Sequence, residues 1–121
     1  MNSKILIVED NLHIRENLAE LLELDHYTVL SACDGNEGCQ MALQQLPDLI
    51  LCDIQMPVMD GYHMLEYVRK QPSLNHSKFI FFTASAEKKE IEWGMQMGAD
   101  DYIVKPFSWE DMQAKVNKIL S

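Results

Sequence analysis

Four apolar runs in the sequence each lead into polar residues that can take part in chemistry. These polar residues are Glu9 and Asp10, Asp53, Thr83, and Lys105. Together they supply three carboxylates, one hydroxyl and one ammonium group. Carboxylate oxygens bind hard cations such as Mg²⁺, and a carboxylate beside such a cation can attack phosphorus. If the fold brings these residues together, they form a site that can hold a metal ion and accept a phosphoryl group.

The pattern of apolar residues predicts strands and helices that alternate along the chain. Short apolar runs predict five strands, at residues 4–9, 28–32, 49–53, 79–83 and 102–105. Apolar residues at helical spacing predict five helices, at residues 12–25, 36–46, 61–70, 87–97 and 109–120. This order is typical of an α/β fold with a parallel sheet covered on both faces. In such sheets ligands bind beyond the carboxyl ends of the strands, where the strand order reverses, so the five polar residues are expected at one edge.

Capping residues support several of these helix boundaries. Either Asp10 or Asn11 can cap the first helix, because a short polar side chain there can accept a hydrogen bond from the first turn. Ser108 followed by Asp111 resembles a capping box at the start of the last helix. Gly98 stands where the fourth helix is expected to end.

Length and composition limit the class of protein. A chain of 121 residues suits one domain, here residues 1–121. No segment approaches the roughly 18 apolar residues of a membrane span, and no secretory signal is visible, so a cytoplasmic protein without membrane contact is expected. The formal charge of −9 disfavours direct binding of nucleic acid. The cysteines lack C-x-x-C spacing and are expected to be reduced; they are Cys33, Cys39 and Cys52.

The acidic strand ends suit magnesium better than zinc. Glu9, Asp10 and Asp53 would repel one another and raise one another's pKa unless a cation neutralised them. All-oxygen ligation is what Mg²⁺ prefers, and no His or Cys stands at these strand ends to bind Zn²⁺. Simpler explanations exist for single residues, such as a helix cap for Asp10 or a surface lysine for Lys105. The whole set, with each member at the end of a strand, favours a site.

Four motifs in the chain resemble those of the receiver domain of response regulators in two-component signalling, including chemotaxis regulators. They are ILIVEDN at residues 5–11, DIQMPVMDG at 53–61, TAS at 83–85 and GADDYIVKPF at 98–107. Their order and spacing are specific to that family, and the resemblance extends over essentially the whole chain. It implies a doubly wound, flavodoxin-like (βα)5 fold with strand order 2-1-3-4-5.

The resemblance also implies a role for each residue that matches a family position. Asp53 matches the phosphoacceptor and a Mg²⁺ ligand. Glu9 and Asp10 match the acidic pair that holds Mg²⁺, and the backbone carbonyl of Gln55 matches a further ligand. The other matches are Thr83 and Lys105 as the pair that contacts phosphate, Thr83 and Tyr102 as the conformational switch, and Lys105–Pro106 as a peptide bond that is usually cis.

The function implied by the resemblance is that of a phosphorylation-dependent signalling module. A sensor histidine kinase or a phosphotransfer protein would pass a phosphoryl group to Asp53, and the change in conformation would control a downstream protein or a C-terminal output domain. The chain would promote only its own phosphorylation and dephosphorylation and turn over no independent substrate. A phosphorylation-dependent homodimer is also consistent with the resemblance. The cognate kinase, the output, the phosphoryl lifetime and the length of the whole regulator stay open.

The fourth predicted helix offers a candidate partner surface. Family members often use their fourth helix, fifth strand and fifth helix as the readout face. If Ile91 and Met95 point inward, Trp93 and Met97 lie outside, four residues apart on one face. An exposed Trp–Met pair suits a partner contact, whereas a single amphipathic residue lying on the surface is the simpler alternative.

Three alternatives are weighed against a phosphoacceptor receiver. A phosphatase of the haloacid-dehalogenase type needs a second carboxylate two residues after its aspartyl nucleophile, and that position is Gln55. A flavodoxin-like cofactor binder would need a phosphate loop after the first strand, where this chain has negative charge instead. A degenerate receiver would lack some site residues, and none is missing here.

Overall fold

Strands and helices alternate along the chain in the computed structural model, which describes residues 2–84 and 87–121. The strands are β1 (Lys4–Val8), β2 (Thr28–Ala32), β3 (Leu49–Asp53), β4 (Lys78–Thr83) and β5 (Asp101–Val104). The helices are α1 (Leu12–Leu24), α2 (Gly35–Gln45), α3 (Gly61–Arg69), α4 (Lys88–Gln96) and α5 (Trp109–Leu120), with a short 3-10 helix at Pro72–Leu74. Each predicted strand and helix is present, with bounds within one residue of those expected. Within the described residues, no helix is both long and apolar enough to cross a membrane.

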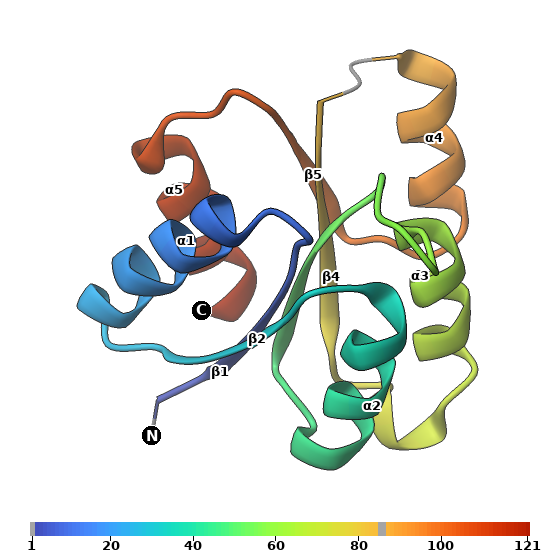
Figure 1. Cartoon of the computed structure of the whole chain (residues 1–121), viewed down its shortest axis with the longest axis horizontal. Helices are drawn as coiled ribbons and strands as arrows, with labels where there is room; N and C mark the ends of the chain where they lie inside the picture. The colour runs from blue at the N-terminus through green and yellow to red at the C-terminus, as the bar shows by residue number, and fades with distance from the viewer. Residues whose placement is uncertain (1, 85–86) are drawn as a thin grey trace.

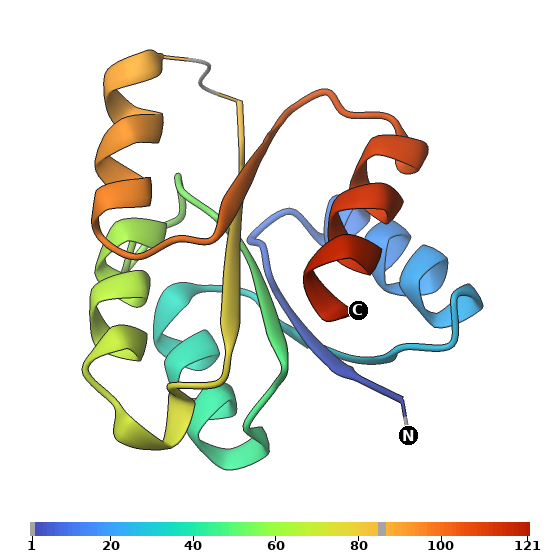
Figure 2. The ribbon, with the colours of Figure 1, turned by 180° about the vertical axis from the view of Figure 1, so that it is seen from behind.

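The five strands form one parallel sheet in the order β2-β1-β3-β4-β5, which confirms the expected topology. Helices α1 and α5 cover one face of the sheet, and α2, α3 and α4 cover the other (Figure 1). The view from behind shows the same two layers around the central strands (Figure 2). The strand order reverses between β1 and β3, so the carboxyl ends of these two strands border the place where such folds bind ligands.

Alternating side chains of the strands build two separate cores, one on each face. Ile5 and Ile7 pack with residues of α1 and α5, whereas Leu6 and Val8 pack with residues of α2 and α3. Every residue of β3 is buried, as expected for a central parallel strand covered by helices on both sides. The strands are therefore anchored by packing on both faces of the sheet.

Helix caps agree with the expected boundaries and settle one alternative. Asn11, rather than Asp10, caps α1, and its side chain accepts a hydrogen bond from the Ile14 amide at 3.1 Å. Ser108 caps α5 in the same way, and Gly98 has a φ of 113° just after α4. Since Asn11 provides the cap, the Asp10 carboxylate is not engaged in capping and can take part in the chemistry at the strand edge.

Candidate functional site

The register of the sheet brings the polar strand ends to one edge. Val8 of β1 pairs with Cys52 of β3, and Thr83 of β4 pairs with Val104 of β5. The residues at or just beyond these positions therefore lie side by side at the carboxyl edge: Glu9, Asp53, Thr83 and Lys105. This convergence was predicted from the sequence.

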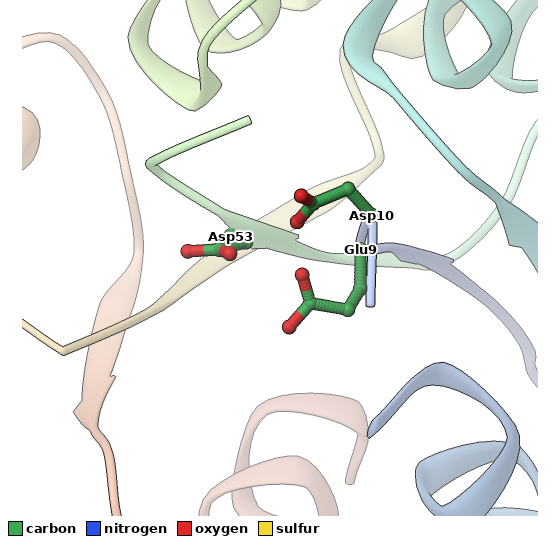
Figure 3. Close-up of side chains that lie close together, drawn as sticks. All are labelled: Glu9, Asp10 and Asp53. Atoms are coloured by element: carbon green, nitrogen blue, oxygen red, sulfur yellow. The ribbon is translucent and has the colours of Figure 1, made fainter. Parts of the chain in front are cut away.

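Three carboxylates form the acidic centre of this edge. One oxygen each from Glu9, Asp10 and Asp53 lie within 4.8 Å of one another. Figure 3 shows the first two side chains extending from the end of β1 beside Asp53. Glu9 and Asp53 are 1% and 6% exposed, whereas Asp10 is open to solvent. An all-oxygen set with one open side fits Mg²⁺, which binds one or two carboxylates directly and keeps several waters.

Lys105 links two of these carboxylates. Its Nζ lies 2.9 Å from Oε1 of Glu9 and 3.3 Å from Oδ2 of Asp53, and 4.9 Å from the centre of the Phe82 ring. Burial lowers the pKa of Lys105, but the hydrogen bond to Glu9 and the charge of Asp53 outweigh this, so its pKa is raised and it stays charged. Three carboxylates and one ammonium leave two negative charges, which one divalent cation would balance.

Asp10 is a carboxyl of the cluster whose pKa is raised by its surroundings. Although its side chain is largely exposed, partial desolvation raises the pKa of its carboxyl, and the hydrogen bond and charge of Glu9 raise it further. A proton or a metal ion would relieve this repulsion. The raised pKa of Asp10 is therefore consistent with a site built to receive a cation.

Arg15 is a residue of this site that sequence reasoning missed. Its Nη1 donates a hydrogen bond of 2.7 Å to the backbone carbonyl of Glu9. The side chain comes from the first turns of α1 and fixes the turn that presents Glu9 and Asp10. A single arginine in an amphipathic helix gives no sequence signal for such a contact, because the acceptor is a main-chain atom.

The remaining predicted site residues take the following places. The Gln55 amide donates to Oδ1 of Asp53 at 3.3 Å, so its backbone lies directly beside that carboxylate. Thr83 is 2% exposed, and its carbonyl accepts a hydrogen bond from the Lys105 amide. The peptide bond between Lys105 and Pro106 is cis. Ser85 of the third motif lies outside the described residues.

Tyr102, the expected switch residue, is partly buried at the middle of β5. Its ring packs against the core on the α2, α3 and α4 side of the sheet. Nζ of Lys115 lies 5.0 Å from the centre of the ring and donates a hydrogen bond to the Tyr102 carbonyl. The aromatic ring thus contacts both this core and the ammonium group of Lys115 from α5.

The prediction of which residues form the outer face of α4 is partly wrong. Trp93 is 52% exposed, as predicted, but Met97 is partly buried against the core, and Met95 is 39% exposed rather than inside. The inner face is centred on Gly94, which is buried and would bring a Cβ to 3.0 Å from the Phe81 ring. Glycine has no apolar side chain to mark a buried position. The hydrophobic pattern therefore predicted the wrong rotation of α4 about its own axis.

Comparison with known sequences identifies the family. Residues 5–117 match the family described as response regulator receiver domain. The alkaline phosphatase synthesis transcriptional regulatory protein PhoP of Bacillus subtilis (strain 168) is 38% identical over 120 residues, which cover 99% of this chain and 49% of PhoP. The chain spans about half the length of the curated relatives it matches.

Solved structures of similar proteins have the same architecture. The chemotaxis protein CheY4 of Vibrio cholerae superimposes with a TM-score of 0.93 at 28% identity, over 98% of this chain and 99% of CheY4. The receiver domain of the sensor histidine kinase PA1611 of Pseudomonas aeruginosa PAO1 has a TM-score of 0.90 at 32% identity, over 100% of both chains, and is described with a magnesium ion coordinated in its active site cleft. With this fold and these matches, the chain belongs to the receiver domain family of response regulators in two-component signalling.

Proposed function

We propose that residues 1–121 act as a phosphoacceptor receiver domain whose Asp53 takes a phosphoryl group in a Mg²⁺-dependent reaction. The donor is the phosphohistidine of a sensor histidine kinase or a phosphotransfer protein. The phosphorus–nitrogen bond of the donor breaks while an Asp53 oxygen forms the new bond to phosphorus. The observation that carries the proposal is the position of Asp53, whose carboxylate lies beside both Lys105 and the Glu9–Asp10 pair.

Each residue around Asp53 has a part in this reaction. Mg²⁺, held by Glu9, Asp10, Asp53 and the backbone carbonyl of Gln55, would neutralise charge on the incoming phosphoryl group. Lys105 is already 3.3 Å from Oδ2 of Asp53, close enough to pair with a phosphoryl oxygen once the new bond has formed.

The response to phosphorylation is a shift between two conformations. The new phosphoryl oxygens accept hydrogen bonds, and the Thr83 hydroxyl moves to donate one of them. Tyr102 then repacks on the side of the sheet where its ring now contacts the core. The conformation in which these phosphate contacts form becomes the more populated one.

The same geometry argues against turnover of an independent substrate. A phosphatase that used Asp53 as nucleophile would need an acid two residues later to protonate the leaving group. That residue is Gln55, whose side chain is exposed and cannot act as a general acid. We therefore propose that the chain promotes only its own phosphorylation and dephosphorylation.

The output is a downstream protein or a C-terminal domain of a longer regulator. Curated relatives of about twice the length are named as transcriptional regulators, which favours a DNA-binding output domain in those proteins. The receiver itself, with a charge of −9, would not contact DNA. Its cysteines are all free, in keeping with the reducing cytoplasm in which such a module works. Homodimers formed on phosphorylation are part of this proposal.

A labelling experiment tests the proposed function. Incubation of the protein with a small acyl phosphate and Mg²⁺ should give an acid-stable, base-labile adduct detected by intact mass. Asp53→Ala should abolish the adduct. Asp111→Ala, which removes an exposed carboxylate from the first turn of α5, should leave it unchanged. Equal labelling of both variants would overturn the assignment, and labelling that persists in EDTA would remove the magnesium requirement.

A further inference from the structure

The Phe81 ring separates the start of α3 from the middle of α4. A Cβ on Gly61 would lie 3.0 Å from Cε1 of Phe81, and a Cβ on Gly94 would lie 3.0 Å from Cε2 of the same ring. These two ring atoms are on opposite edges, so the ring lies against both glycines at once. Phe81 is only 2% exposed, and close-packed interiors have little room to absorb a displacement.

The start of α3 in turn lies against the main chain of the phosphoacceptor. A Cβ on Gly61 would be 2.5 Å from the Asp53 carbonyl oxygen and 2.9 Å from Cα of Ile54. The Gly61 amide also donates a hydrogen bond of 2.8 Å to the Ile54 carbonyl. The backbone of Asp53 and the Phe81 ring are therefore both in contact with the same residue.

Tyr62 contacts both Phe81 and α4. Its ring meets Phe81 edge-on with centroids 5.4 Å apart and packs on the Trp93 ring at 4.5 Å. Its hydroxyl donates a hydrogen bond of 3.2 Å to the Glu90 carbonyl. One turn of α4, from Glu90 to Gly94, is thus held by two neighbouring aromatic side chains.

We infer that Tyr62, Phe81 and Gly94 are positioning residues that couple the main chain of Asp53 to α4. This inference rests on the proposed function. The route reaches α4 through Tyr62 and Gly94, and its central residue Phe81 is also the strand partner of Tyr102. Movement of the Asp53 loop is passed through the ring to α4, because neither glycine leaves space to take it up. Coupling between two sites is reciprocal, so a partner that displaces α4 changes ligand affinity at Asp53.

Binding of beryllium trifluoride, a phosphoryl analogue, together with Mg²⁺ provides the test. Gly94→Ala adds a methyl group against Phe81 and should weaken binding by about two- to thirtyfold, the range expected for residues that modulate coupling. The matched control is Gln96→Ala, which changes an exposed residue of the same helix and should bind as wild type does. Amide exchange over residues 88–96, which should change on ligand binding in the wild type, reports the effect on α4.

A double mutant identifies the route. Phe81→Leu shortens the side chain that the new methyl group meets, so the losses from Gly94→Ala and Phe81→Leu should be clearly less than additive. If Gly94→Ala does not fold, Tyr62→Phe replaces it, because this change deletes only the hydroxyl bond to Glu90.

The outcomes separate this inference from the proposed function. Wild-type affinity in Gly94→Ala, additive losses in the double mutant, or unchanged binding and exchange in Tyr62→Phe would overturn the coupling route alone. Failure of the wild-type protein to bind the analogue at all would overturn the proposed function, and the coupling route with it.

Discussion

Replacing Asp10 with asparagine should stabilise the protein without Mg²⁺ and destabilise it, relative to wild type, when Mg²⁺ is present. Asp10 shares the acidic centre with Glu9 and Asp53, and its pKa is raised by desolvation and by Glu9. A carboxyl whose pKa is raised in the folded state disfavours folding when it is ionised. The amide of asparagine removes the charge and can donate a hydrogen bond to Glu9.

The size of the effect follows from the distances. Two negative charges 4.8 Å apart repel by about 0.9 kcal/mol in water and by about 3.5 kcal/mol at an effective dielectric constant of about 20. Asp10 is exposed and Lys105 offsets part of the repulsion, so the value should be near the lower limit. We expect Asp10→Asn to raise the free energy of unfolding in EDTA by about 1 kcal/mol, or to raise the Tm by about 4 °C.

Magnesium should reverse this order. A ligand at about 100 times its Kd stabilises the folded state by about 2.7 kcal/mol, and the variant, lacking one carboxylate, should gain much less. Urea unfolding at pH 7 in EDTA and in saturating Mg²⁺ measures both values. Glu16→Gln is the control, because it removes an exposed carboxylate of α1 and should behave as wild type in both conditions.

The pH dependence gives a second check on the same variant. The advantage of Asp10→Asn should be fully present above the raised pKa of folded Asp10, where the carboxyl is ionised in both the folded and the unfolded state. As the pH falls through the raised pKa of folded Asp10 and then the ordinary value of an aspartate, the advantage should shrink to zero. If Asp10→Asn is less stable than wild type in EDTA at pH 7, or gains as much from Mg²⁺, the electrostatic reasoning is refuted.

Three further substitutions test other contacts. Lys105→Ala leaves the buried Glu9 without its cation and should lower the free energy of unfolding in EDTA by about 2 kcal/mol; a loss below about 0.5 kcal/mol in urea unfolding would contradict the ion-pair geometry. Val58→Gly should raise the free energy of unfolding by about 1 kcal/mol, and with it the Tm by a few degrees, because a β-branched residue at φ 71° is strained. An unchanged or lower Tm would argue against this strain. Arg69→Met removes donors to the Gly98 carbonyl and should cost about 2 kcal/mol, with Arg69→Lys recovering only part; full recovery by lysine would exclude a role for the guanidinium fork.

The topology and the polar edge could be predicted because both follow from local signals. Parallel strands buried on both faces read as apolar runs, and residues such as Asp53 and Lys105 mark where those runs end. Once the strands are parallel, their ends must meet. No knowledge of side-chain packing is needed for that step.

The rotation and the ends of single helices could not be predicted as well. Gly94 marks the inner face of α4 without any apolar side chain, so Met95 and Met97 were assigned to the wrong sides. The second helix was predicted to extend to residue 46, but Leu46 lies just after the last residue of α2, at φ 49°, and is 42% exposed. The contact of Arg15 with the Glu9 carbonyl depends on how α1 docks, which is set by tertiary packing rather than by sequence spacing.

Mapping the phosphorylated residue tests the proposed chemistry most directly. An aspartyl phosphate is reduced by borohydride to homoserine, which peptide mass spectrometry locates to a single position. After reaction with an acyl phosphate and Mg²⁺, we expect homoserine at position 53 and at no other carboxylate of the acidic centre. Modification at Glu9 or Asp10 with an unmodified Asp53, or a phosphohistidine in place of an acyl phosphate, would contradict the assignment of Asp53 as the phosphoacceptor.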